Sequence, residues 1–86
     1  MKIKNGYTLR SIADSFIVVP TEGDITLDGI ITLNESGAFL FNVMQEDVTK
    51  EKLLEKMLAE YKIDATTAQK DIDIFLERLS KTGLVE

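Results

Sequence analysis

The spacing of apolar residues changes along the chain, from the alternation of strands to the three- and four-residue spacing of helices. A first strand is predicted around Tyr7 and Leu9 and towards Ile12, and a second over Phe16–Val19. Pro20 should end the second strand, because proline has no N–H to give to a ladder. The first third of the chain is therefore expected to form sheet.

The segment "ITLDGIITL" allows two interpretations. Asp28 and Gly29 could form the centre of a tight hairpin, or a kink before a single strand over Ile30–Leu33. We favour the single strand, because Ile25–Leu27 is very short for a strand of its own.

The remainder of the chain has helical periodicity. Asn34, Thr49 and Asp64 each precede such a stretch and can accept an early backbone N–H as helix caps, with the first helix beginning at Glu35. Gly83 is well placed to end the third helix. The apolar faces of the helices are formed by Leu40, Val43, Met44, Leu53, Leu54, Met57, Leu58, Tyr61, Ala68, Ile72, Phe75, Leu76 and Leu79.

The order of these elements defines the fold class. Strands followed by helices indicate an α+β architecture. We expect a three-stranded antiparallel sheet followed by three helices, in a winged-helix-like arrangement. With 86 residues, residues 1–86 are expected to form a single domain.

The composition limits the chemistry. The chain has neither cysteine nor histidine, which excludes disulfides, thiolate sites and the commonest general base and metal ligand. Ser36 has no histidine partner, so helix-terminus chemistry explains Glu35 and Ser36 better than catalysis does. We therefore expect no enzyme activity, no cofactor and no metal site.

Charge and hydropathy argue against a nucleic acid or a membrane as the partner. The net charge is −5, whereas a nucleic-acid binder usually presents a basic face. No segment approaches the roughly 20 apolar residues of a membrane span, and "MKIKNGYTLR" lacks the apolar stretch of a signal peptide. A cytoplasmic protein, in contact with neither membrane nor nucleic acid, is expected.

One stripe of the third helix is left unexplained by the core. Ile74 falls almost opposite the core stripe, in a row with Thr67, Asp71 and Arg78 and beside Phe75. A single exposed apolar side chain is normal and needs no explanation. Alternatively, Ile74 forms the floor of a groove with Asp71 and Arg78 at its rim.

The strand over Ile30–Leu33 could supply the second wall of such a groove. At the edge of a sheet its unpaired backbone groups could accept an extended peptide as an added strand, with pockets for alternate side chains. Alternatively, the helices of the domain cover both faces of this strand.

Three stretches, "SFIVVP", "GIITLNESGAFLF" and "DIDIFLERLSKTGLVE", resemble the PqqD-like proteins, also called RiPP recognition elements. The resemblance runs from about Tyr7 to Glu86 and implies three strands followed by three helices. It also implies a leader peptide added antiparallel to the third strand, with its side chains packed against the third helix. The peptide-binding positions implied are Ile30, Ile31, Thr32, Leu33, Thr67, Asp71, Ile74, Phe75 and Arg78.

The resemblance therefore predicts a non-catalytic adaptor that binds the leader of a ribosomally made precursor peptide. Its partners would be this peptide and a modifying enzyme, such as a radical enzyme or a leader protease or cyclase, with the adaptor itself a monomer. Asp71, with Asp73 and Glu77 nearby, would favour a leader carrying lysine or arginine, unless Asp73 and Glu77 only form a solvated face. The alternative function is a winged-helix DNA-binding domain or another protein–protein interaction domain.

Overall fold

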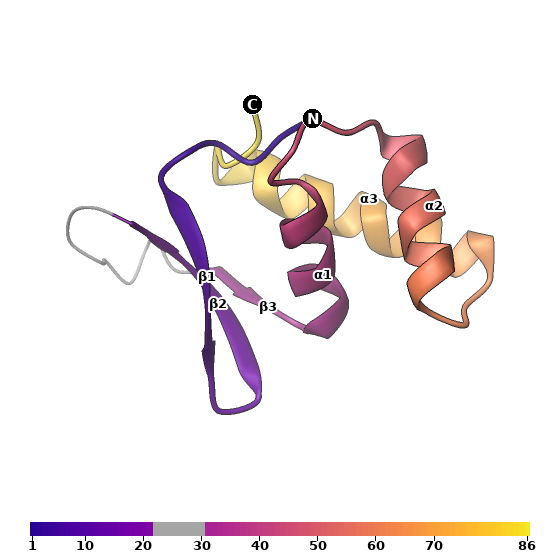
Figure 1. Ribbon diagram of the computed structural model, residues 1–86, viewed down its shortest axis with the longest axis horizontal. Coiled ribbons are helices and arrows are strands. Elements are labelled where there is room, and N and C mark those ends of the chain that lie inside the picture. Colours follow the sequence, from indigo (N-terminus) through magenta and orange to yellow (C-terminus); the bar gives the residue numbers. More distant parts are fainter. Residues whose placement is uncertain (22–30) are drawn as a thin grey trace.

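The computed structural model describes residues 1–21 and 31–86. Strands come first and helices follow, which confirms the predicted α+β fold, and in Figure 1 the sheet lies to one side of the helices. The elements are β1 (Tyr7–Ile12), β2 (Ser15–Pro20), β3 (Ile31–Leu33), α1 (Glu35–Val43), α2 (Lys50–Glu60) and α3 (Ala65–Lys81).

The sheet is antiparallel, in the order β1-β2-β3. β2 extends one residue beyond the predicted strand at each end and finishes at Pro20, which pairs with Tyr7. Asp28, Gly29 and Ile30, on which the two interpretations of "ITLDGIITL" depend, lie outside the described residues. Within the described part, β3 leads directly into α1 through Asn34 alone.

Each helix begins at the predicted cap. The side-chain oxygens of Asn34, Thr49 and Asp64 accept the backbone N–H three residues later, at 2.8, 3.1 and 2.7 Å. These bonds satisfy N–H groups that have no partner within the first turn of a helix. The local sequence therefore determines where each helix begins.

The end of α3 follows the predicted glycine signal. Gly83 has a φ of 75°, in the left-handed region that favours glycine, and its N–H donates to the carbonyl of Ser80 at 3.1 Å. The N–H of Leu84 donates to the carbonyl of Leu79 at 3.0 Å, and the Leu84 side chain is buried. This pair of bonds is a Schellman motif, and it turns the chain back onto the core.

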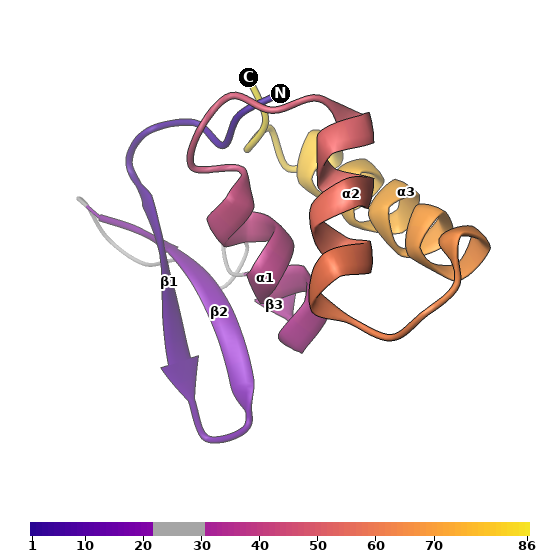
Figure 2. The same cartoon turned by 45° about the vertical axis from the view of Figure 1, so that its right-hand side comes forward.

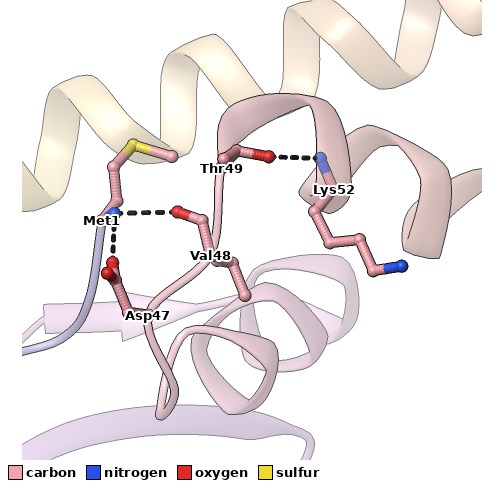
Figure 3. A network of polar contacts seen from close by, with 5 residues as sticks. All are labelled: Met1, Asp47, Val48, Thr49 and Lys52. Atoms are coloured by element: carbon pink, nitrogen blue, oxygen red, sulfur yellow. Dashed lines mark hydrogen bonds and ion pairs between the residues drawn. The ribbon is translucent and has the colours of Figure 1, made fainter.

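The start of the chain is fixed against the segment between α1 and α2 (Figure 3). The ammonium of Met1 donates to the Asp47 carboxylate at 2.7 Å and to the Val48 carbonyl at 2.8 Å. This hydrogen bond and the positive charge of the ammonium lower the pKa of Asp47. Ile3 and Val85 then form a bridge between the two terminal segments, which lie close together in Figures 1 and 2.

The core lies between the sheet and the three helices, and most of the predicted helix positions contribute to it. Leu58 is the exception, because 37% of its surface is exposed and the prediction that it faces the core is wrong. The buried residues of α2 are Leu53 and Met57. Leu58 lies about 140° around the helix from Leu53, too far for both to face the same neighbours.

The cap of α3 predicts a pH dependence of stability. Hydrogen bonds from Thr67 lower the pKa of Asp64 below its ordinary value of 3.8. The ionised cap therefore stabilises the fold above the unfolded pKa, and its contribution is lost as the pH falls through the lower, folded pKa. Asp64→Asn keeps an acceptor but removes the charge.

We expect this variant to be less stable than the parent near pH 7, and we expect the difference in stability to shrink as the pH is lowered towards 2, by urea denaturation at both values. A stability difference of the same size at both pH values would contradict this assignment.

Candidate functional site

The hydrogen-bonding pattern of the sheet decides which backbone groups of β3 are free. Residues of an antiparallel strand point their N–H and C=O alternately to one neighbour and the other. The register places Ile12 opposite Ser15 across the two-residue turn, and this flanking pair is hydrogen-bonded in a two-residue hairpin. Counting along β2, the backbone N–H and C=O of Ile17 also point towards β1, whereas those of Phe16 point towards β3.

The consequence for β3 follows from its register with β2. Leu33 pairs with Phe16 and Ile31 pairs with Val18, so these residues exchange hydrogen bonds with β2. Thr32 lies between them, and its N–H and C=O point away from β2, at the edge of the sheet. Within the described residues β3 pairs only with β2, so this edge is open to a further strand.

A pocket of about 200 Å³ lies between the β3–α1 junction and α3. Its apolar part consists of Leu33, Leu40, Ile74 and Phe75, and 51% of the surface of Ile74 is exposed. The lining residues are Leu33, Asn34, Ser36, Gly37, Leu40, Asp71, Ile74, Phe75 and Arg78. The exposed face of Ile74 is therefore the wall of a concave site rather than an isolated surface side chain.

Arg78 connects α3 to the open edge. Its Nη2 donates to the carbonyl oxygen of Thr32 at 2.9 Å, across 46 positions of sequence. This bond agrees with the register, because it requires the Thr32 carbonyl to point away from β2. We call the surface formed by the Thr32 edge, Leu33, Ile74, Phe75 and Arg78 the β3–α3 groove.

The β3–α1 junction contributes residues that the sequence analysis did not assign to the site. Asn34, Ser36, Gly37 and Leu40 all line the pocket. A Cβ at Gly37 would lie 3.2 Å from both the Asn34 Oδ1 and the Leu33 Cβ, so glycine allows α1 to begin close against β3. The sequence did contain a signal for this close approach, because a glycine within a helix lowers its stability unless close packing requires it.

The charges around the groove differ from the predicted pattern. Asp71 lines the pocket, but Asp73 pairs with Lys50, and Glu77 pairs with Lys81 at 3.1 Å. The hydrogen bond from Lys50 lowers the pKa of Asp73. Neither Asp73 nor Glu77 lines the pocket. The structure therefore favours the alternative, that these two residues form a solvated face, over the prediction that they help Asp71 to attract a basic leader.

Two predicted site residues lie apart from the pocket. The Ile31 side chain is buried in the core. Thr67 is exposed in the first turn of α3, where its N–H donates to Asp64, and it does not line the pocket. Ile30 is outside the described residues. The structure brings together the predicted residues Leu33, Asp71, Ile74, Phe75 and Arg78 in the pocket, and joins Thr32 to them through its bond to Arg78.

Across residues 1–21 and 31–86, no group of three or more acidic side chains is placed to hold a metal ion. None of the helices found there has the length and apolar character needed to cross a membrane.

The fold and the site define a small α+β domain with an apolar pocket beside a sheet edge. Residues 16–85 match the family model described as coenzyme PQQ synthesis protein D (PqqD), and the chain therefore belongs to the PqqD family. No curated protein matches the chain.

A solved structure shows the same fold. It is described as TbiB1 in complex with the TbiA(beta) leader peptide, and it matches with a TM-score of 0.74 and 24% sequence identity. The match covers 100% of this chain and 95% of that chain. The arrangement of three strands followed by three helices is thus common to both proteins.

Proposed function

We propose that this protein is a non-catalytic adaptor that binds the leader segment of a ribosomally made precursor peptide and presents it to a modifying enzyme. Membership of the PqqD family and the fold shared with a leader-bound protein support this function. The observation that carries it is that the N–H and C=O of Thr32 are left unpaired by β2 at a sheet edge beside the apolar pocket at Ile74.

The proposed mode is strand addition. The leader pairs with the N–H and C=O of Thr32, while alternate side chains of the leader point towards α3. One apolar side chain enters the pocket between Leu33, Ile74 and Phe75. Main-chain pairing supplies a sequence-independent part of the affinity, and the pocket supplies specificity.

The proposal includes the remaining features of the adaptor. Residues 1–86 act as one peptide-binding domain, as a monomer in the cytoplasm, without a cofactor. The client is a peptide-modifying enzyme, such as a radical enzyme, a cyclase or a leader protease. The winged-helix DNA-binding alternative is not favoured, because the net charge is −5 and α3 carries Asp71, Asp73 and Glu77.

The test is a titration of the ¹⁵N-labelled protein with the leader segment of a precursor peptide encoded beside it. We expect a Kd of about 1 μM or tighter, as for a binding free energy of about −8 kcal/mol. Backbone shifts should concentrate on residues 31–33 and on the face of α3 between residues 71 and 78. No binding, or shifts confined to another surface, would oppose the proposal, and binding of a DNA duplex at low salt would favour the alternative.

A further inference from the structure

The guanidinium of Arg78 occupies a position that an added strand would need. It donates to the Thr32 carbonyl, which is also the acceptor for the N–H of a strand added to this edge. An added strand lies about 4.8 Å from its neighbour, so its backbone would lie beside the guanidinium at the edge of β3. The Thr32 carbonyl oxygen has two lone pairs, so strand addition leaves Arg78 sharing this acceptor or displaced from it, and in both cases next to the bound segment.

The Arg78 guanidinium has no carboxylate partner among the described residues. Among residues 1–21 and 31–86, no ion pair includes Arg78, while Lys50 and Lys81 pair with Asp73 and Glu77. A carboxylate can accept two parallel N–H bonds from a guanidinium, which is a stronger interaction than one bond to a neutral carbonyl. A carboxylate on the bound segment would supply such a partner for Arg78.

The spacing on α3 indicates where that partner would lie. Arg78 is four residues beyond Ile74, or about 6 Å along the helix axis. Side chains two residues apart on one face of a strand are about 6.8 Å apart. A ligand residue two positions from the one that fills the pocket would therefore lie opposite Arg78.

We infer that Arg78 determines the specificity of the groove: the segment it recognises carries an aspartate or glutamate two residues from its pocket-filling apolar residue. This inference rests on the proposed function and adds the charge of the ligand to it. Asp71 lies three residues before Ile74 on the same face of α3 and lines the same pocket. Its negative charge disfavours a ligand carboxylate at that end, so the two charges also set the direction of the bound segment.

The inference can be tested with a synthetic peptide. The probes are two acetylated and amidated seven-residue peptides of threonines with leucine at the centre, one with a single glutamate two residues before the leucine and one with a single glutamate two residues after it. The comparison peptides have glutamine in place of the glutamate. Each is titrated into the parent protein, into Arg78→Met, which keeps an apolar stem, and into Arg10→Met, a matched loss of an exposed arginine on β1.

We expect one of the two glutamate peptides, the one that places its carboxylate at Arg78, to bind the parent and Arg10→Met about fivefold more tightly than its glutamine counterpart, as for an exposed ion pair. In Arg78→Met this preference for glutamate should disappear. Equal affinities in the parent, or a preference that persists in Arg78→Met, would overturn the inference.

Two further outcomes separate this inference from the proposed function. If the natural leader binds but none of the synthetic peptides does, the inference fails and the adaptor function stands. If the natural leader also fails to bind, the adaptor function fails and the inference fails with it. The ¹⁵N spectrum of each variant, compared with that of the parent, shows whether the fold is retained.

Discussion

Replacing Ile74 by aspartate is expected to abolish binding of the leader peptide while leaving the fold intact. In the free protein the side chain is 51% exposed, so a carboxylate at this position remains solvated and costs little stability. In the complex the same carboxylate would replace the apolar wall of the pocket beside the Asp71 charge, and it would compete with the ligand for the Arg78 guanidinium four residues further along α3. Loss of the apolar contact, together with desolvation of the new charge, should cost about 3 kcal/mol, or about 100-fold in Kd.

The matched control for this variant is Leu58→Asp. Leu58 is also a partly exposed apolar residue of a helix, but it lies on α2 and does not line the pocket. We expect its peptide affinity to match that of the parent. Isothermal titration of the parent and both variants gives the affinities, and thermal melting confirms that each is folded. Retained affinity in a folded Ile74→Asp protein would show that the groove is assigned to the wrong surface.

Replacing Phe41 by alanine is expected to have the largest effect on stability. The ring is 2% exposed and belongs to the core cluster that joins the sheet to the helices. Truncation of a buried phenylalanine costs about 3–5 kcal/mol, because it loses apolar contacts and leaves a cavity. For a chain of this size that is a large part of the whole stability, and the melting temperature should fall by about 20 °C.

Phe39→Ala provides the comparison for Phe41→Ala. Phe39 lies on the same helix but is only partly buried, and its ring packs edge-on against Tyr61 with the centroids 5.6 Å apart. Thermal denaturation followed by circular dichroism should show a clearly smaller loss for this variant. Equal losses at the two positions would mean that Phe41 is not central to the core.

The features that could be predicted from the sequence are those with local causes. Asn34 and Asp64 start helices because their side chains bond a backbone N–H three residues away, and Gly83 ends α3 because it tolerates a positive φ. The exposure of Ile74 was also predictable, since it follows from helical periodicity alone. The Glu77–Lys81 pair has the i,i+4 spacing of helix ion pairs and could have been found in the same way.

The features that could not be predicted depend on tertiary packing. The bond between Arg78 and Thr32 joins residues 46 positions apart, and the Lys50–Asp73 pair joins α2 to α3. Neither spacing has a local signature. Leu58 shows the same limit, because an apolar residue beside the core stripe is buried only if a neighbouring element reaches it. The family resemblance indicated the strand and the helix of the groove, but only the structure showed the hydrogen bond from Arg78 to Thr32 that joins them.

The central claim is that a peptide is added as a strand at Thr32. The leader titration tests this claim most directly when the hydrogen exchange of the Thr32 amide is measured. The register points the Thr32 N–H away from β2, so in the free protein it should exchange rapidly with deuterium. With saturating leader peptide we expect its exchange to slow by at least about tenfold, because the N–H then donates to the peptide backbone. Saturable binding that leaves the Thr32 exchange rate unchanged would contradict strand addition.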